Sequence, residues 1–203
     1  MAPKKRGPKV DVQLTQKRKR DIVREAARLF DQIGYHGVNM EMIAEAAGLK
    51  KPTLYHYFKG KEEILFVMQD ALILSLRERM RERIAKRLRP LEILQGIYED
   101  IFGQLHDSPG VVRSFFEHQR ELGAEFDERM RRERNAYTTE VMKVFSAGMD
   151  RGEIARTDVR LLVLTFFGIS NWAYQWYRPG RDPAPQIIAR QCFDLFCRGM
   201  FPR

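Results

Sequence analysis

Apolar residues recur at three- and four-residue spacing along most of this chain, a period that predicts amphipathic helices. The first apolar stripe covers residues 17–33, and glycines at positions 34, 48 and 60 interrupt the pattern that follows it. Because glycine commonly ends helices, these breaks divide the first third of the chain into three helices. Their expected ranges are 17–33, 40–47 and 52–58, and Asn39 offers an N-cap to the second.

Longer helices are expected after position 60. No segment alternates apolar and polar residues over the length of a β-strand. The expected ranges are 61–88, 91–105, 111–122, 125–149, 158–177 and 184–200. The sequence therefore predicts an all-α fold of about nine helices. The last two are apolar over most of their circumference, which predicts burial both in a helical bundle and against a second copy of the chain.

The net charge of +9 is concentrated at the N-terminus, where the first 20 residues hold eight Lys and Arg against one Asp. A basic segment attached to a nearly neutral body is typical of proteins that bind a polyanion. The segment Lys4–Lys9 either enters an A·T-rich minor groove or adds nonspecific attraction to phosphates as a tail. With one arginine in this segment, the second interpretation is the simpler.

Two short helices joined by a glycine-containing turn and braced by a longer helix predict a helix-turn-helix. Leu54 and Phe58 share one face and are expected to pack on the bracing helix. Other side chains then face outward, where hydroxyl, imidazole and ammonium groups can contact bases and phosphates. The expected DNA-binding residues are Asn39, Lys51, Pro52, Thr53, His56, Tyr57 and Lys61. The competing interpretation makes these aromatic side chains ordinary core residues.

The run IAEAAGLKKPTLYHYFKGKEEIL resembles the DNA-binding domain of the TetR family of bacterial transcriptional repressors. The family pattern IA..AG....TLY.HF..KE.L is met at Ile43, Ala44, Ala47, Gly48, Thr53, Leu54, Tyr55, Phe58, Lys61, Glu62 and Leu65. This resemblance adds Tyr55 to the expected DNA contacts. The chain departs from the family's common residues at Lys50, Pro52 and Tyr57, and we expect these changes to leave DNA binding intact.

Polar and aromatic residues interspersed in the apolar helices of the second half predict a largely apolar ligand cavity. The candidate lining residues are Phe102, Phe115, Phe116, Tyr137, Met142, Phe166, Asn171 and Trp172. Ordinary core packing with internal hydrogen bonds is the better explanation of any one of them, and only the set as a whole indicates a cavity. The segment NWAYQWYRPG, residues 171–180, resembles the signature NW.Y.WYRPGG of a TetR subgroup in which many members respond to acyl-CoA thioesters.

By this resemblance the effector is an acyl-CoA or a related lipophilic carboxylate derivative, with Arg178 or Arg181 near its phosphates. A different hydrophobic or aromatic ligand is the alternative. The resemblance also implies a homodimer formed through the last two helices. Because the helix expected at 61–88 spans both parts of the chain without a linker, we expect an effector to release the DNA by shifting this helix. We expect three parts: a flexible basic arm, residues 1–15; a helix-turn-helix domain, 16–61; and a ligand-binding and dimerisation domain, 62–203.

Other classes of protein find less support in the sequence. No nucleophile elbow, phosphate loop, metal-ligand spacing or catalytic dyad is present, so we expect no catalytic residues, no enzymatic activity, no cofactor and no metal. Cys192 and Cys197 are expected to be reduced thiols of a cytoplasmic protein, and neither a signal peptide nor a membrane-spanning run is found. A nonspecific architectural DNA-binding protein and an activator with the same fold remain open.

Overall fold

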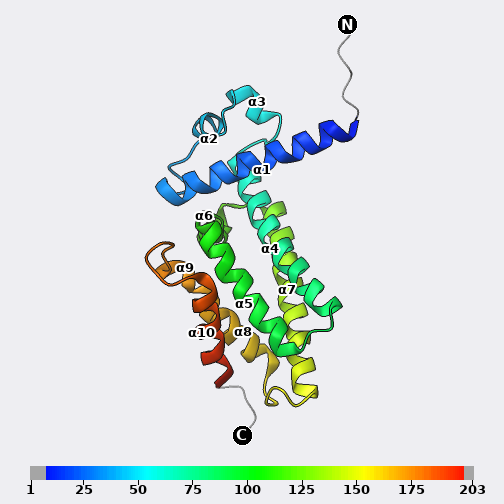
Figure 1. Cartoon of the computed structure of the whole chain (residues 1–203). Helices are drawn as coiled ribbons and strands as arrows, with labels where there is room; N and C mark the ends of the chain where they lie inside the picture. Colours follow the sequence, from blue (N-terminus) through cyan, green and yellow to red (C-terminus); the bar gives the residue numbers. More distant parts are fainter. Residues whose placement is uncertain (1–7, 199–203) are drawn as a thin grey trace.

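The computed structural model describes residues 8–198, and every regular element within that range is helical (Figure 1). In chain order the elements are α1 (Pro8–Ile33), α2 (Met40–Ala46), α3 (Lys51–Tyr55), α4 (Lys61–Ala85), α5 (Pro90–Asp107), α6 (Pro109–Glu117), the 3₁₀ turn η1 (Gln119–Glu121), α7 (Ala124–Asp150), α8 (Val159–Asn171), α9 (Ala173–Trp176) and α10 (Pro185–Arg198). The prediction of an all-α fold is confirmed.

Helices α1, α2 and α3 form a small head at one end of the molecule, and α4 leads from this head into the bundle (Figure 1). The core of the head contains side chains that are at most 2% exposed, among them Ile22, Phe30, Ile43, Leu54 and Phe58. These are apolar positions at helical spacing on three helices, so burial of one face of each helix holds the head together.

The entry to α2 and its exit are each fixed by one residue. The side-chain Oδ1 of Asn39 accepts hydrogen bonds from the backbone N–H groups of Glu41 and Met42, both at 3.0 Å, as the predicted N-cap requires. Gly48, after the end of α2, has φ +65°, a left-handed conformation that glycine adopts without a steric penalty. Together the cap and the glycine define the short α2–turn–α3 unit.

The bundle is built around α5, which packs against α4, α6, α7, α8 and α10. Tyr98 of α5 is fully buried, and its hydroxyl donates a hydrogen bond to the carbonyl of Phe166 in α8 at 2.8 Å. The ring centre of Phe166 lies 4.5 Å from that of Tyr98, 5.4 Å from Phe145 and 5.5 Å from Phe196. Phe166 therefore lies at the centre of an aromatic core that joins four helices.

Several boundaries differ from the sequence-based expectation. Helix α3 ends at Tyr55 rather than at position 58, and α6 ends at Glu117 rather than near position 122. Helix α1 begins at Pro8, so residues 8–15 of the expected flexible arm are helical, and residues 1–7 lie outside the described part of the chain. The helix expected over 158–177 is divided at Trp172 into α8 and α9. Helix α4 ends at Ala85 rather than near position 88, because Arg87 takes a left-handed φ of 56°.

The two cysteines lie in α10 as free thiols, with Cys197 buried and Cys192 half-buried. Burial raises the pKa of the Cys197 thiol to about 12, so the thiol stays protonated at neutral pH. Of the helices that residues 8–198 form, none combines the length and the hydropathy that crossing a membrane would require.

Candidate DNA-binding face and effector cavity

Helix α3 presents one side to the core of the head and the other to the surface. Leu54 and, just beyond the helix, Phe58 are buried, which fixes how α3 sits on the head. The other side chains point away from that core: Lys51, Pro52, Tyr55 and His56 are exposed, and Thr53 and Tyr57 are half-buried. A recognition helix needs this division, since its buried face orients it and its exposed residues reach the groove.

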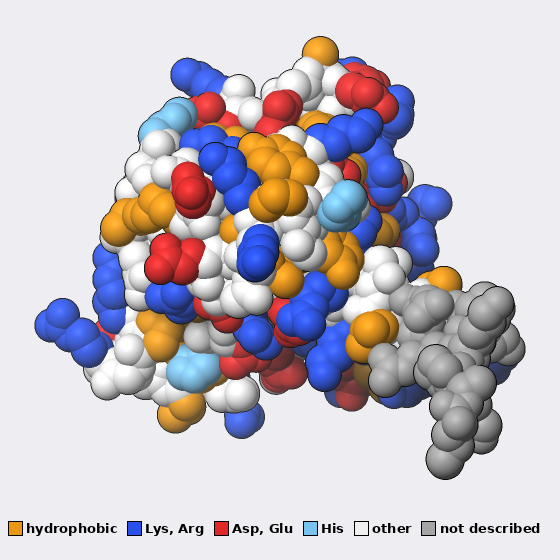
Figure 2. All heavy atoms as spheres, turned by 90° about the horizontal axis from the view of Figure 1, so that it is seen from above, with side chains coloured by type: hydrophobic (Ala, Val, Ile, Leu, Met, Phe, Trp, Pro, Cys, Tyr) orange, Lys and Arg blue, Asp and Glu red, His pale blue; other side chains and the backbone are white. Residues whose placement is uncertain are grey.

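The surface around α3 combines cations with aromatic and hydroxyl groups. In the view onto the head, Lys and Arg side chains are spread around exposed hydrophobic side chains, with Asp and Glu between them (Figure 2). A shallow hollow lies between the start of α2 and α3, and its lining includes His36, Asn39, Lys51, Tyr55 and Lys61. Four of these five residues belong to the predicted DNA-binding set, and the structure brings them together.

Lys61, the first residue of α4, makes contacts within the head that the sequence did not indicate. Its Nζ donates hydrogen bonds to the carbonyls of Tyr35 at 2.9 Å and Val38 at 3.0 Å. The same ammonium lies 4.3 Å from the centre of the Tyr35 ring, a cation–π contact. Lys61 therefore holds the α1–α2 loop, whereas its expected contact with DNA phosphate stays a prediction.

Lys51 and Asn39 differ in how strongly their polar side-chain atoms are bound within the head. Lys51 Nζ lies 3.4 Å from Glu41 Oε2, an exposed ion pair of the kind that contributes between zero and about 1 kcal/mol. Such a lysine can exchange its carboxylate partner for a phosphate at little cost. Asn39 already uses its side-chain oxygen as the cap of α2, so only its amide N–H₂ is available to DNA.

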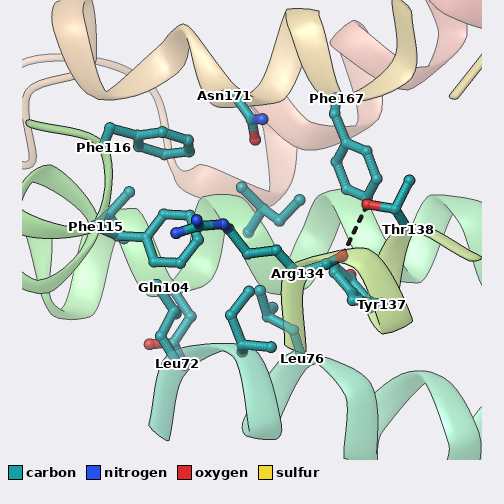
Figure 3. Close-up of a pocket in the computed structure, with 13 residues that line it drawn as sticks. Leu72, Leu76, Gln104, Phe115, Phe116, Arg134, Tyr137, Thr138, Phe167 and Asn171 are labelled. Atoms are coloured by element: carbon teal, nitrogen blue, oxygen red, sulfur yellow. Dashed lines mark hydrogen bonds between the residues drawn. The ribbon is translucent and has the colours of Figure 1, made fainter. Parts of the chain in front are cut away.

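A cavity of about 130 Å³ lies inside the bundle, between α4, α5, α6, α7 and α8 (Figure 3). It is lined by Leu72, Ile73 and Leu76 of α4, Ile101 and Gln104 of α5, Val112, Phe115 and Phe116 of α6, Arg134, Tyr137 and Thr138 of α7, and Phe167 and Asn171 of α8. A mainly apolar wall with a few polar groups is typical of small-molecule sites.

Among the described residues that line the cavity, Arg134 alone is charged, and its side chain extends across the cavity toward Phe115 (Figure 3). The side chain is 23% exposed, and Nη1 is buried without a hydrogen-bond partner among the described residues. Nη2 lies 3.9 Å from Asp127 Oδ1, and the guanidinium carbon lies 6.0 Å from the centre of the Phe115 ring. Burial lowers the pKa of Arg134 below its usual range, and the Asp127 carboxylate does not offset that effect.

Tyr137 adds a second polar group beside the cavity. Its hydroxyl is buried and has no hydrogen-bond partner among the described residues. Burial, reinforced by the Asp100 carboxylate, raises the pKa of Tyr137 above its usual range, so the hydroxyl remains protonated. A buried hydroxyl without a partner carries a desolvation cost that a bound acceptor would remove.

Comparison with known proteins identifies both halves of the chain. Residues 22–68 match the family model "Bacterial regulatory proteins, tetR family", and residues 87–200, more than half of the chain, match "Tetracyclin repressor-like, C-terminal domain". The chain belongs to the TetR family. It is accordingly a transcriptional regulator with a helix-turn-helix head rather than an enzyme, as the sequence predicted.

Several relatives that align with most of this chain are regulators. The transcriptional repressor KstR2 of Mycobacterium tuberculosis is 25% identical over 190 residues, which cover 90% of this chain and 92% of KstR2. The "Fatty acid metabolism regulator protein" of Bacillus subtilis is 27% identical over 148 residues, 72% of this chain and 76% of that protein. A crystal structure of AibR with isovaleryl coenzyme A and operator DNA is 26% identical, covers 88% of this chain and 97% of AibR, and superposes with a TM-score of 0.76.

Four of the nine residues predicted to bind the effector line the cavity: Phe115, Phe116, Tyr137 and Asn171. The other five do not. The prediction of direct lining is wrong for Phe102, Met142, Phe166 and Trp172, whereas the expected contact of Arg178 with the effector's phosphates stays a prediction. Phe102 and Phe166 are fully buried in the bundle core, Met142 packs against that core, and Trp172 is 63% exposed. The guanidinium of Arg178 donates to the carbonyls of Tyr177 and Gln175, both at 2.9 Å.

The missed residues lie mostly on helices that the sequence analysis had singled out. Phe167 replaces its neighbour Phe166, because adjacent residues of a helix point about 100° apart. Arg134 was missed because it sits in a helix rich in charged residues, where a solvated cation is expected. Its spacing to Tyr137 and Thr138, three and four residues on, places it on the same helix face and was the signal available.

Proposed function

We propose that this regulator is a homodimeric repressor that binds a palindromic operator and is released when a small lipophilic effector enters the cavity between α4 and α8. The observation that carries the proposal is that α6 forms part of the cavity wall and also contacts the head. Val112, Phe115 and Phe116 line the cavity. The first turn of the same helix lies directly on α1 at Gly110, where an added Cβ would meet the Ala27 carbonyl.

Further contacts tie the α6 region to the head. Arg113 Nη1 lies 3.6 Å from Asp31 Oδ1 of α1, and the ring of His118 lies 5.2 Å from that of Tyr35. His36 Nε2 lies 3.0 Å from Glu121 Oε1 in η1. A shift of α6 caused by a ligand would therefore be transmitted to α1 and the α1–α2 loop.

Helix α4 provides a second connection, because it carries Leu72 and Leu76 of the cavity and, at its first residue, Lys61 of the head. A ligand that separates α4 from α6 would rotate the head relative to the bundle. A coupling of about 1–3 kcal/mol between the two sites is enough to lower operator affinity by about 5- to 150-fold.

A second copy of this chain is the expected partner of the apolar face on α8 and α10. Leu161 and Leu164 of α8 are 62% and 57% exposed, and Ile187 and Leu195 of α10 are 51% and 66% exposed. Large apolar side chains gathered on two neighbouring helices mark an interaction surface. A two-fold dimer would place two copies of α3 about 34–36 Å apart, the spacing of successive major grooves on one side of DNA.

A short acyl-CoA is the effector that the relatives and the cavity favour. AibR binds isovaleryl coenzyme A, whose acyl group has few carbon atoms. The cavity volume of about 130 Å³ is close to the ~150 Å³ of an engineered cavity that accommodates benzene. An acyl group of about five or six carbons would fit, with the coenzyme outside the cavity. Other small hydrophobic or aromatic molecules of this size are the alternative.

Selection of bound fragments from random DNA, followed by titration of isovaleryl-CoA and longer acyl-CoAs, tests this proposal. We expect one palindromic sequence to be enriched, with an affinity about 10³-fold or more above that for unrelated DNA. We expect the short thioester to release it. Binding without sequence preference would instead identify a nonspecific architectural protein, and sequence-specific binding strengthened by the thioester would contradict release.

A further inference from the structure

The guanidinium of Arg134 lacks an adequate counter-ion in the structure. The nearest carboxylate is that of Asp127, half-exposed and 3.9 Å away, which is at the limit of an ion pair. Nη1 has no hydrogen-bond partner among the described residues, and the ring of Phe115 is the aromatic surface nearest to the charge. Exposed pairs at such a distance contribute little, so the positive charge is only weakly compensated.

Burying a charged group is unfavourable unless the group is paired and hydrogen-bonded. The planar fork of an arginine matches the two oxygens of a carboxylate, which can accept two parallel hydrogen bonds. A neutral ester or thioester carbonyl offers one weaker acceptor and no charge. The group that best compensates Arg134 is therefore a carboxylate that arrives with the ligand.

We propose that Arg134 binds the carboxylate of the ligand, and that the cavity accepts small free monocarboxylic acids of about five to seven carbon atoms. The rest of such a molecule would lie against Leu72, Leu76 and Phe167, which line the same cavity. The volume of about 130 Å³ is enough for a branched aliphatic chain or a single ring. This inference rests on the proposed function in assigning the cavity to the effector, and within that cavity it favours a free acid over the acyl-CoA.

Calorimetric titration of the full chain with isovalerate and benzoate tests the inference, with isovaleramide as the uncharged analogue. The decisive variant is Arg134→Met, which keeps much of the side-chain length and removes the charge. The matched control is Arg132→Met on the same helix, because the Arg132 side chain is 66% exposed and does not line the cavity. Thermal unfolding without ligand is measured for each protein.

We expect the wild type to bind at least one of the acids, and to bind isovaleramide about tenfold more weakly or worse than isovalerate. Arg134→Met should weaken acid binding by about 10- to 100-fold, the range typical of a hydrogen bond to a charged group. Arg132→Met should bind as the wild type does. In the absence of ligand, Arg134→Met should be as thermally stable as the wild type or more stable, because a poorly paired cation has been removed from the cavity.

Unchanged acid binding by Arg134→Met, or equal binding of acid and amide, would overturn the assignment of Arg134. Binding of isovaleryl-CoA without binding of either acid would overturn the inference and leave the proposed function standing. Binding of an acid that depends on Arg134, together with failure to find an operator, would uphold the inference about the cavity while contradicting the proposed repressor.

Discussion

Replacing Gly110 with alanine tests how closely α6 is packed on α1. A Cβ at this position would meet the Ala27 carbonyl oxygen and would lie 2.9 Å from Asp31 Cβ and 3.0 Å from the Ala27 carbonyl carbon. Backbone atoms cannot move aside as a flexible side chain can, so α6 must shift away from α1. Overpacking of this kind costs about 1–3 kcal/mol.

Gly103→Ala in α5 is the matched control, because no atom of the described residues lies within 4 Å of a Cβ built there. Both variants gain the roughly 0.5–1 kcal/mol of alanine over glycine within a helix. The difference in unfolding free energy between the two variants therefore isolates the clash, and we expect Gly110→Ala to be less stable by about 1–3 kcal/mol. At about 2–4 °C per kcal/mol, its Tm falls roughly 2–12 °C below that of Gly103→Ala.

Urea unfolding at one fixed protein concentration gives the stabilities, and fluorescence anisotropy with labelled operator gives the DNA affinities. Gly110→Ala should also lose operator affinity, by about fivefold or more, although position 110 is not on the DNA-binding face. Equal stability of the two alanine variants would refute the close approach of α6 to α1. A stability loss with unchanged operator affinity would refute the role of α6 in coupling the cavity to the head.

Four further predictions concern the head, its contact with α6, and the dimer. Tyr55→Ala should lower operator affinity about tenfold with unchanged Tm, because the side chain is exposed and lies on the expected reading face; anisotropy and thermal unfolding check this. Lys61→Met should destabilise the protein by about 1–3 kcal/mol in urea, since two backbone carbonyls lose their donor. Burial lowers the pKa of His118, so below about pH 6.5 the unfolded state binds more protons than the folded state. The unfolding free energy should therefore fall as the pH decreases through that range. The variant His118→Gln should show a weaker pH dependence. Leu195→Glu should yield monomers by light scattering, because it places a charge in the expected dimer face.

Each of these predictions has an outcome that would count against it. A Tyr55→Ala protein with full operator affinity would move the reading surface away from α3. Lys59→Met is the control for Lys61→Met, because the Lys59 side chain is exposed. Equal stability of the two variants would show that the hydrogen bonds of Lys61 to the α1–α2 loop do not stabilise the protein. If the unfolding free energy of His118→Gln depends on pH as that of the wild type does, another group is responsible for the pH dependence. If Leu195→Glu is still a dimer by light scattering, the dimer interface lies elsewhere.

The head could be predicted closely because its signals are local. Glycines after α1 and α2, the Asn39 cap and apolar residues at helical spacing specify one longer helix and two short ones without reference to the rest of the chain. The start of α1 could not be placed in the same way. Val12 and Leu14 are exposed, so the apolar stripe that marks a buried helix face begins only near Ile22.

The cavity was harder to predict because its lining depends on how five helices are rotated against one another. The sequence indicated α6, α7 and α8 correctly, but Phe166 turned out to be core and Phe167 to be lining. The exposed Trp172 marks the point where the expected helix divides into α8 and α9. Arg134 was missed because it lies among the charged residues of α7, although its spacing of three residues from Tyr137 places it on the same helix face as a predicted lining residue.

The central claim is that one dimer binds operator and effector antagonistically. The most direct test measures this coupling from both sides. Anisotropy titration of labelled operator, with and without saturating isovaleryl-CoA or isovalerate, gives the effect of the ligand on operator affinity. Calorimetry gives the reciprocal effect of operator on the affinity for the ligand. We predict that at least one of the two ligands lowers operator affinity by about fivefold or more, and that operator lowers the affinity for that ligand by the same factor. Binding of both partners to one dimer with unchanged affinities would contradict the account.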